Sequence, residues 1–404
     1  MHVTRLRTAT VVMAIGAVAL AAACGSSDKT PSSSNTTSPS SPSVKLTVAS
    51  FTADFSAMAQ LKALAARGDG LIGVLLPDTT TSARYESYDR PYLKQAFEAA
   101  GLSSDQFKID NAQGSATTMQ TQADADITNG ASVLILDAID SGSGAAIEAS
   151  AKAKGVAVID YDRLTQGGPA DRIYVSFDNV NVGKFIGKGE VDCIKAWKVT
   201  KPNILIMDGA ATDNNAKLFA QGYNGVLKPF FDKGTYVKVG EPAGTWTPAV
   251  TATNFTQQFT AHPNINAVVT PNDDNANAVI AQLQSQQVPP KTFPTTGQDA
   301  SPVGLQNILK GYQCGTVYKP ITAEAQAAVA IALYLRAGEK PPAVLLNGTT
   351  RDDQAGKDVA SVLLTPKWVT AANMQDTVIK DKWIKVSALC ISAVKTACVA
   401  AGIK

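Results

Sequence analysis

Planar polar side chains stand at the ends of several apolar runs in this sequence of 404 residues. The segment TPNDDNAN at 270–277 follows the apolar run INAVV and carries five amide or carboxylate side chains. Each hydroxyl of a neutral, polyhydroxylated ligand both donates and accepts a hydrogen bond, and a carboxylate beside an amide or guanidinium group satisfies both roles. The pattern indicates a binding site for such a ligand. The candidate residues are Arg84, Tyr85, Asp162, Arg163, Asp213, Asn215, Asn272 and Asp299.

Histidine content argues against catalysis and against metal binding. The chain has two histidines, His2 near its start and His262 in the segment TAHPN. Catalytic triads and histidine-based metal sites are therefore nearly excluded. No Glu stands among the strand-end residues, which disfavours the paired acids of a glycosidase. We expect no catalytic residue, no metal site and no cofactor.

Some of these polar residues could instead cap helices. Asp213 and Asp273 each precede an expected helix, and an N-cap stabilises a helix by about 1 kcal/mol. A cap needs only Ser or Thr, however, whereas Asp, Asn and Arg recur here at six strand ends. Trp246, in the segment GTWTPA, and Tyr85 add aromatic faces on which the C–H face of a sugar ring can pack. A loop Trp that packs in the core is the alternative for Trp246.

The elements that position these residues repeat one unit from about residue 70. A short apolar run is followed by a polar loop and then an amphipathic stretch. Continuous apolar runs are typical of parallel strands that are covered on both faces, so an α/β architecture with right-handed crossovers is predicted. The expected strands are 71–77, 107–110, 132–137, 156–161, 203–208, 236–241, 266–271 and 293–298.

Two irregular connections interrupt this repeat, at 173–185 and at 316–320. They are what a two-domain protein needs where its chain crosses between domains. In open α/β sheets, ligands bind outside the carboxyl ends of the strands, so the polar residues should converge on a cleft between two sheets. Lys319 lies in the second connection, directly before Pro320, where its ammonium group could bridge the ligand contacts of both domains.

The first residues read as an export signal. A basic start with Arg5 and Arg7 precedes the apolar run VVMAIGAVALAAA at 11–23, and Cys24 follows. This is the arrangement of a bacterial lipoprotein signal, in which residues 1–23 are removed and Cys24 is lipidated. A short membrane anchor is the alternative, but 13 apolar residues are too few to span a bilayer. We expect an extracytoplasmic protein, held at the membrane by its lipid through a flexible tether over 24–68.

Four further cysteines favour disulfides, because an exported protein meets an oxidising compartment. Cys193, Cys314, Cys390 and Cys398 permit three pairings, and the short spacing favours a bond between Cys390 and Cys398. A zinc site is the alternative, although no CxxC motif or histidine partner accompanies them. The net charge of +2 gives no electrostatic basis for binding nucleic acid.

Several segments closely resemble the D-xylose-binding periplasmic proteins of sugar ABC transporters. The likeness runs from about 70 to 385, and DNNAKLF and TVYKPIT are specific to this branch of the sugar-binding group. The segments are VIDYDR, YVSFDNVNVG, MDGAATDNNAKLFAQG, TPNDDNANAVIAQLQ, TGQDA, TVYKPIT and LLTPKWVTAANMQDTVIKDKW.

The resemblance implies two doubly wound α/β domains joined by a three-segment hinge, the type I periplasmic binding protein fold. We expect an N-terminal lobe of residues 69–176 plus 319–347 and a C-terminal lobe of 177–318 plus 348–404. The implied sugar contacts are Arg84, Asp162, Arg163, Asp213, Asn215, Asn272, Asp299 and Lys319, with Trp246 and Tyr85 as stacking aromatics. Tyr85 stands where the family usually has Trp.

The implied function is capture of a monosaccharide, with a pentose such as D-xylose expected, and its delivery to the permease of an ABC importer. A monomer without a cofactor is expected. One alternative is a sensor that presents the sugar to a membrane receptor kinase. The other is a carbohydrate-active enzyme.

Overall fold

Seven strands form the largest of the three sheets in the described residues. The computed structural model describes residues 46–79, 82 and 84–404. The strand order is β10-β11-β5-β4-β3-β1-β2, and every neighbouring pair is parallel except β10 with β11. The bounds are β1 Leu71–Leu76, β2 Phe107–Asn111, β3 Ala131–Leu136, β4 Ala157–Tyr161, β5 Ile173–Phe177, β10 Gly348–Asp352 and β11 Lys357–Leu364.

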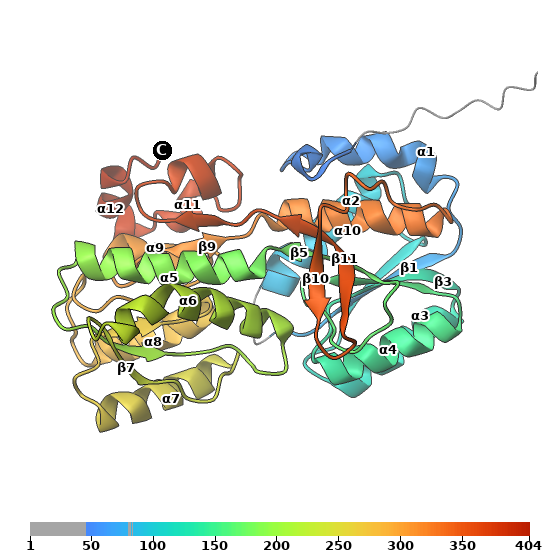
Figure 1. The fold of residues 1–404 in the computed structure, drawn as a ribbon. Coiled ribbons are helices and arrows are strands. Elements are labelled where there is room, and N and C mark those ends of the chain that lie inside the picture. The colour runs from blue at the N-terminus through green and yellow to red at the C-terminus, as the bar shows by residue number, and fades with distance from the viewer. Residues whose placement is uncertain (1–45, 80–81, 83) are drawn as a thin grey trace, which may run out of the picture. The chain divides into compact units, whose positions relative to one another are not determined.

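Helices cover this sheet on both faces (Figure 1). The helix α10 (Ile321–Arg336) packs on β3, β4 and β5 and is buried along almost its whole length, and most of its residues are Ala or larger apolar residues. The other elements are the π-helical turn η3 (Tyr85–Asp89), α2 (Arg90–Ala99), α3 (Ala116–Thr128) and α4 (Ser141–Ala153).

The second sheet has the parallel order β7-β6-β8, and a separate antiparallel pair, β9 with β12, lies beside it. The expected strand 293–298 contributes only single bridges, from Thr295 to Val268 and from Gln298 to Val317. The strand bounds are β6 Asn203–Ile206, β7 Val237–Gly240, β8 Ala267–Val269, β9 Thr316–Tyr318 and β12 Lys367–Val369.

The helices of this part are α5 (Asn179–Ala196), α6 (Asn214–Asp232), α7 (Pro248–Ala261), α8 (Asp273–Ser285) and α9 (Pro302–Lys310). The helices α5 and α6 pack unusually closely, because a Cβ on Gly183 would lie 2.1 Å from the carbonyl oxygen of Phe219. The C-terminal elements are η4 (Gln375–Ile379), α11 (Val386–Leu389), η5 (Ser392–Val394) and α12 (Lys395–Ala400).

The chain passes between the two sheets three times, from β5 into α5, from β9 into α10, and from β11 into β12 (Figure 1). We call residues 46–177 and 321–364 the first lobe, and residues 179–318 and 367–404 the second lobe. The predicted α/β class with two mainly parallel sheets is confirmed.

Two of the expected boundaries are wrong. Residues 46–68 are not a tether, because η1 (Val48–Ser50), η2 (Ser56–Leu61) and α1 (Lys62–Ala65) pack on the first lobe through buried apolar side chains such as Phe55 and Met58. Residues 348–364 belong to the first lobe rather than the second, because β11 pairs with β5 and extends the seven-stranded sheet.

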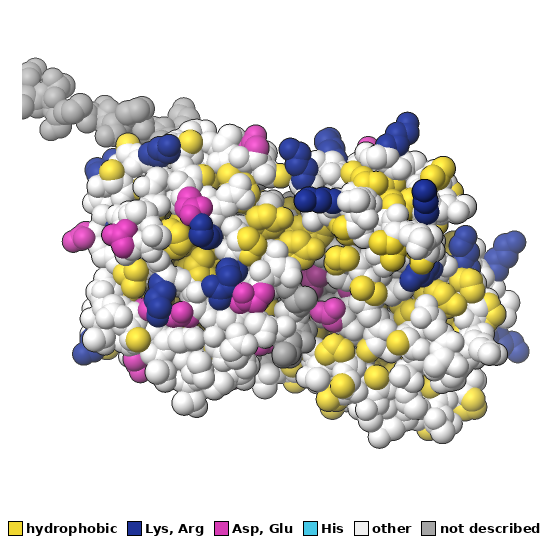
Figure 2. All heavy atoms as spheres, turned by 180° about the vertical axis from the view of Figure 1, so that it is seen from behind, with side chains coloured by type: hydrophobic (Ala, Val, Ile, Leu, Met, Phe, Trp, Pro, Cys, Tyr) yellow, Lys and Arg dark blue, Asp and Glu magenta, His cyan; other side chains and the backbone are white. Residues whose placement is uncertain are grey.

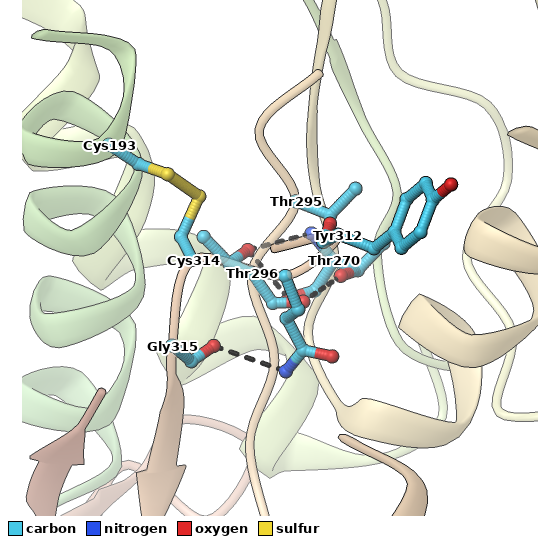
Figure 3. Close-up of a disulfide and its surroundings, with 8 residues drawn as sticks. Cys193, Thr270, Thr295, Thr296, Tyr312, Cys314 and Gly315 are labelled. Atoms are coloured by element: carbon cyan, nitrogen blue, oxygen red, sulfur yellow. Dashed lines mark hydrogen bonds between the residues drawn. A yellow bond between two sulfur atoms is a disulfide. The ribbon is translucent and has the colours of Figure 1, made fainter. Parts of the chain in front are cut away.

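Both disulfides lie in the second lobe. Cys193 on α5 is bonded to Cys314, just before β9, and Figure 3 shows this bond beside the chain that leads into that strand. Thr295 and Cys314 are joined by a backbone hydrogen bond of 2.8 Å next to it. Cys390 is bonded to Cys398, the pairing that their spacing favours. Among residues 46–79, 82 and 84–404, no helix is long and apolar enough to cross a membrane. Cys24 and the export signal lie outside the described residues.

Candidate functional site

A pocket lies between the two lobes and brings together the residues that the sequence singled out. The ten predicted contacts line it, together with three residues that were not predicted. The lining residues are Ser82, Arg84, Tyr85, Asp162, Arg163, Asp213, Asn215, Phe219, Trp246, Asn272, Gln298, Asp299 and Lys319.

Arg84 holds the first-lobe side of the pocket together. It lies at the start of η3, and its guanidinium group donates to Asp89 at 2.7 and 3.0 Å, to Asp162 at 3.0 Å and to Glu324 at 3.0 Å. All four side chains are at least nine-tenths buried. Three carboxylates therefore fix the plane of the Arg84 guanidinium group at the pocket wall.

Asp162 directly follows β4 and has a φ of 56°, in the left-handed region that residues other than glycine rarely adopt. Such strain persists where the surrounding contacts over-determine the conformation. The backbone carbonyl of Asp162 accepts hydrogen bonds from Tyr174, Ser176 and Asn215, at 2.8 to 2.9 Å. These bonds hold the Asp162 carboxylate toward Arg84 in the pocket.

Arg163 reaches from the first lobe to the second. Its Nη2 donates to the Tyr85 hydroxyl at 3.0 Å, and its Nε lies 3.3 Å from Asp213 of the second lobe. Asp137, at the end of β3, lies 3.6 Å from the same nitrogen and is fully buried. The guanidinium groups of Arg84 and Arg163 also lie 5.3 and 5.6 Å from the Tyr85 ring centroid, within cation–π range.

Two pocket residues of the second lobe are also helix caps. The Asp213 carboxylate accepts from the backbone N–H of Asn215 at 2.8 Å and begins α6. The Asn272 side chain accepts from the backbone N–H of Asn275 at 2.9 Å and begins α8. Asp273 is not a cap, because its carboxylate accepts from Gln313 and from the backbone of Ser301. Asn272 therefore caps α8 and also lines the pocket.

Trp246 presents a half-buried indole ring to the pocket. Its Nε1 donates to Asp213 at 3.0 Å, and the edge of Phe219 approaches it with a centroid distance of 6.5 Å. A Cβ on Gly209 would lie 2.2 Å from the indole, so the ring lies flat against a backbone that only glycine permits. Trp246 is thus held rigidly at the edge of the core, where it packs against apolar residues and also lines the pocket.

Lys319 lies where the chain crosses from β9 to α10. Its ammonium group lies 3.5 Å from Asp162 of the first lobe and 3.4 Å from Asp299 of the second. Asp299 has a φ of 93° and Ala300 one of 50°, two consecutive left-handed residues. The position of Lys319 between both lobes is the one that the sequence suggested.

Charge in the pocket is balanced. Three cations, Arg84, Arg163 and Lys319, face three carboxylates, Asp162, Asp213 and Asp299. Burial would raise the pKa of Asp162, but the charges of Arg84, Lys319 and Arg163 lower it well below its usual range. Burial raises the pKa of Asp213, although Arg163 opposes this. A balanced set of charges suits a neutral ligand better than an anion.

Free space in the pocket is about 30 Å³. A cavity of roughly 150 Å³ is needed to hold one benzene ring, and a sugar ring is no smaller. In this arrangement the free space is therefore smaller than a sugar ring. Within the described part of the chain, no three His, Cys, Asp or Glu side chains are grouped so that they could hold a metal ion.

Three lining residues were missed by the sequence reasoning. Gln298 directly precedes Asp299 and donates to it at 2.8 Å, so its place at the end of an apolar run could have indicated it. Ser82 belongs to the segment before Arg84 and carries no distinctive signal. Phe219 lies inside α6 and reads as an ordinary core residue.

On the face shown in Figure 2, the described residues carry scattered charges rather than a continuous basic stripe.

Comparisons with known proteins place the chain in a family. It is 38% identical to the D-xylose-binding periplasmic protein of Escherichia coli over 285 residues, which are 70% of this chain and 82% of that protein. A protein of the same name from Haemophilus influenzae is 38% identical over 237 residues, 57% of this chain and 67% of that protein.

A solved structure shows the same fold. The carbohydrate transporter solute-binding protein of Chloroflexus aurantiacus, in complex with D-glucose, has a TM-score of 0.70 at 26% identity, covering 79% of this chain and 98% of that one. The family described as periplasmic binding protein domain matches residues 72–340. The chain therefore belongs to the periplasmic binding protein family, has its type I fold, and is a binding protein rather than an enzyme.

Proposed function

We propose that the protein captures a monosaccharide outside the cytoplasm, with D-xylose as its ligand, and delivers it to the permease of an ABC importer. The observation that carries this proposal is the charge-balanced pocket, in which planar polar groups from both lobes surround the indole of Trp246. Two relatives with 38% identity are named for D-xylose binding, which supports this choice of sugar.

Binding closes the lobes in this proposal. A sugar that touches Asp162 on one lobe and Asn272 on the other stabilises only the closed arrangement, so the ligand shifts the equilibrium toward it. A permease can then distinguish loaded from empty protein by the relative position of the lobes.

We further propose that Cys24 carries the lipid that holds the protein at the membrane. The basic start, the apolar run and the cysteine support this step. The test is to express the parent chain and its Cys24→Ser variant in a bacterium and to fractionate the cells. The parent should fractionate with membranes and the variant should be released, and release of the parent would contradict the anchor.

Calorimetric titration of the purified protein against a panel of pentoses and hexoses tests the ligand. D-xylose should bind with the highest affinity, and Asn272→Ala should weaken it. Ser115→Ala is a matched control, because Ser115 also caps a helix, α3, but does not line the pocket. Both variants lose about 1 kcal/mol of helix capping, and only Asn272→Ala should bind the sugar more weakly. Failure of every sugar to bind, or turnover of a glycoside, would reject the proposal.

A further inference from the structure

Asp273 directly follows the pocket residue Asn272 and is fully buried, but it does not line the pocket itself. Its Oδ1 accepts a hydrogen bond from the side chain of Gln313, and its Oδ2 accepts one from the backbone N–H of Ser301, each at 2.7 Å. The hydroxyl group of Thr316 also donates to this carboxylate. Three donors therefore converge on one buried side chain.

These contacts hold the chain on both sides of Asp299. Before it, the carbonyl oxygen of Gln298 accepts from the backbone N–H of Asp273 at 2.9 Å. After it, the backbone N–H of Ala300 donates to the Thr316 Oγ1 at 3.2 Å, and the Thr316 hydroxyl donates in turn to Asp273. Asp273 is thus linked to the residue before Asp299 and to the residue after it.

The backbone at Asp299 and Ala300 requires such support. Both residues are left-handed, with φ of 93° and 50°, and this conformation persists in residues other than glycine only where surrounding contacts enforce it. The Asp299 carboxylate lines the pocket and lies 3.4 Å from the ammonium group of Lys319. A change in this short segment would therefore move a carboxylate of the sugar site.

The surroundings of Asp273 suit an ionised carboxylate and not a protonated one. An ionised carboxylate only accepts hydrogen bonds, whereas a protonated carboxyl group also donates one. Each Asp273 oxygen already faces an N–H donor, so an added proton would face a donor and one of these bonds would weaken. Burial nevertheless raises the pKa of Asp273 to about 7, against the opposing effect of its three donors.

Several charged or titratable groups lie around Asp273. Arg84 and Tyr88 of the first lobe line one cavity with it, as do Asp274 and Asp299 of the second. The negative charge of Asp299 adds to the rise in the pKa of Asp273. Ionisation of Asp273 and contacts made by Asp299 in the pocket therefore act on the same segment.

We propose that Asp273 is a positioning residue of the sugar site, whose ionised carboxylate holds Asp299 in place, so that protonation of Asp273 weakens sugar binding. This inference rests on the proposed function and adds to it a dependence on the surrounding pH. When only the ionised form binds, the apparent affinity follows the ionised fraction, which rises about tenfold from about pH 6 to about pH 8.

The test is calorimetric titration of the purified protein with D-xylose at about pH 6 and about pH 8. The affinity of the parent should rise about tenfold between them. Asp273→Asn cannot ionise, and its amide N–H faces other donors, so its affinity should be low and nearly equal at both pH values.

Asp208→Asn is the matched control. Burial raises the pKa of Asp208 to about 6, so this carboxyl group titrates in a similar range, but it accepts from Tyr223 and does not line the pocket. This variant should keep the rise in affinity that the parent shows.

Thr316→Val provides a second measurement, which decides the matter if thermal melts show that Asp273→Asn does not fold. It keeps the shape of the side chain and removes a donor that lowers the pKa of Asp273, so the rise in affinity should shift to higher pH. A merely structural effect would instead lower the affinity by the same factor at every pH.

The outcomes separate this inference from the function on which it rests. Xylose binding by the parent with the same affinity at both pH values overturns the role of Asp273 and leaves the proposed function intact. An equal rise in parent and Asp273→Asn, or an unshifted rise in Thr316→Val, also overturns it. Absence of xylose binding by the parent at both pH values rejects the proposed function itself.

Discussion

The ring of Tyr88 stacks on the indole of Trp383 with centroids 3.8 Å apart and planes inclined by 18°. Tyr88 belongs to η3 of the first lobe, whereas Trp383 follows η4 in the second lobe, where its Nε1 donates to the carbonyl oxygen of Ala300 at 2.8 Å. The stack therefore joins the lobes outside the pocket. Because this contact links the two lobes, we expect it to favour the closed form even without ligand.

Replacing Tyr88 by Leu should weaken xylose binding although Tyr88 does not line the pocket. An aromatic pair contributes about 1 kcal/mol beyond its buried area, which corresponds to roughly fivefold in affinity. X-ray scattering of the ligand-free variant should give a larger radius of gyration than the parent.

The control for this variant is Tyr236→Leu. Tyr236 also stacks on a ring, that of Phe230 at 4.6 Å, but both residues lie within the second lobe. Its removal should lower stability without changing sugar affinity. If Tyr88→Leu binds xylose as tightly as the parent does, the stack does not contribute to closure.

The two disulfides should differ in their contribution to stability. Cys193 and Cys314 are 121 residues apart in sequence, whereas Cys390 and Cys398 are 8 apart. Loop-closure entropy predicts a loss of about 5 kcal/mol for the first pair and about 2 to 3 kcal/mol for the second when both cysteines of a pair become Ala. Urea unfolding of the two double variants measures this, and equal losses would show that loop length does not govern the effect.

The pocket could be read from the sequence because parallel strands bring their carboxyl ends to one edge. Asp162 follows β4 and Asn272 comes shortly after β8, so each reaches the pocket by the same rule. Phe219 could not be predicted in this way, because a Phe inside a helix has the same pattern whether it faces the core or a ligand. Its role follows only from the packing of α6 beside Trp246.

Lobe boundaries were harder to predict than the site. The run KDVASVLL at 357–364 reads as a strand, but its partner β5 lies about 180 residues away, and nothing local specifies that pairing. The start of the folded chain had a local signal that was overlooked. The Ser/Thr/Pro composition ends before Leu46, and Phe51 and Phe55 are apolar residues that a tether does not need.

Glu190 should make the protein less stable as pH rises. It is fully buried on α5, and neither carboxylate oxygen has a hydrogen-bond partner in the described part of the chain. Burial raises its pKa well above the usual range. The unfolded chain releases this proton above about pH 4.3, while the folded chain retains it. The unfolded state then binds fewer protons, so the free energy of unfolding falls as pH rises between the two pKa values.

Glu190→Met should remove that part of the pH dependence and stabilise the protein at neutral pH by about 1 to 3 kcal/mol, since an unpaired buried polar group is lost. Urea unfolding at about pH 5 and about pH 8 tests this, because the gap between variant and parent should widen at the higher pH. Glu190→Gln serves as the control that removes the charge and keeps the shape. An unchanged gap would mean that Glu190 finds a partner or that water reaches it.

Trp246 should affect every sugar alike, because it offers a ring face and not a hydroxyl partner. Trp246→Ala removes that surface, and burial of a ring of this size is worth about 2 to 3 kcal/mol. Affinity should fall by roughly the same factor for xylose and for sugars that differ from it at one hydroxyl.

The variant Trp246→Phe separates stacking from hydrogen bonding, since it keeps a ring but loses the Nε1 that donates to Asp213 at 3.0 Å. If stacking dominates, the Phe variant should retain most of the affinity, and if the bond to Asp213 dominates, it should resemble Trp246→Ala. Calorimetry on variants shown to be folded by thermal melts measures both, and unchanged binding by Trp246→Ala would remove the indole from the sugar site.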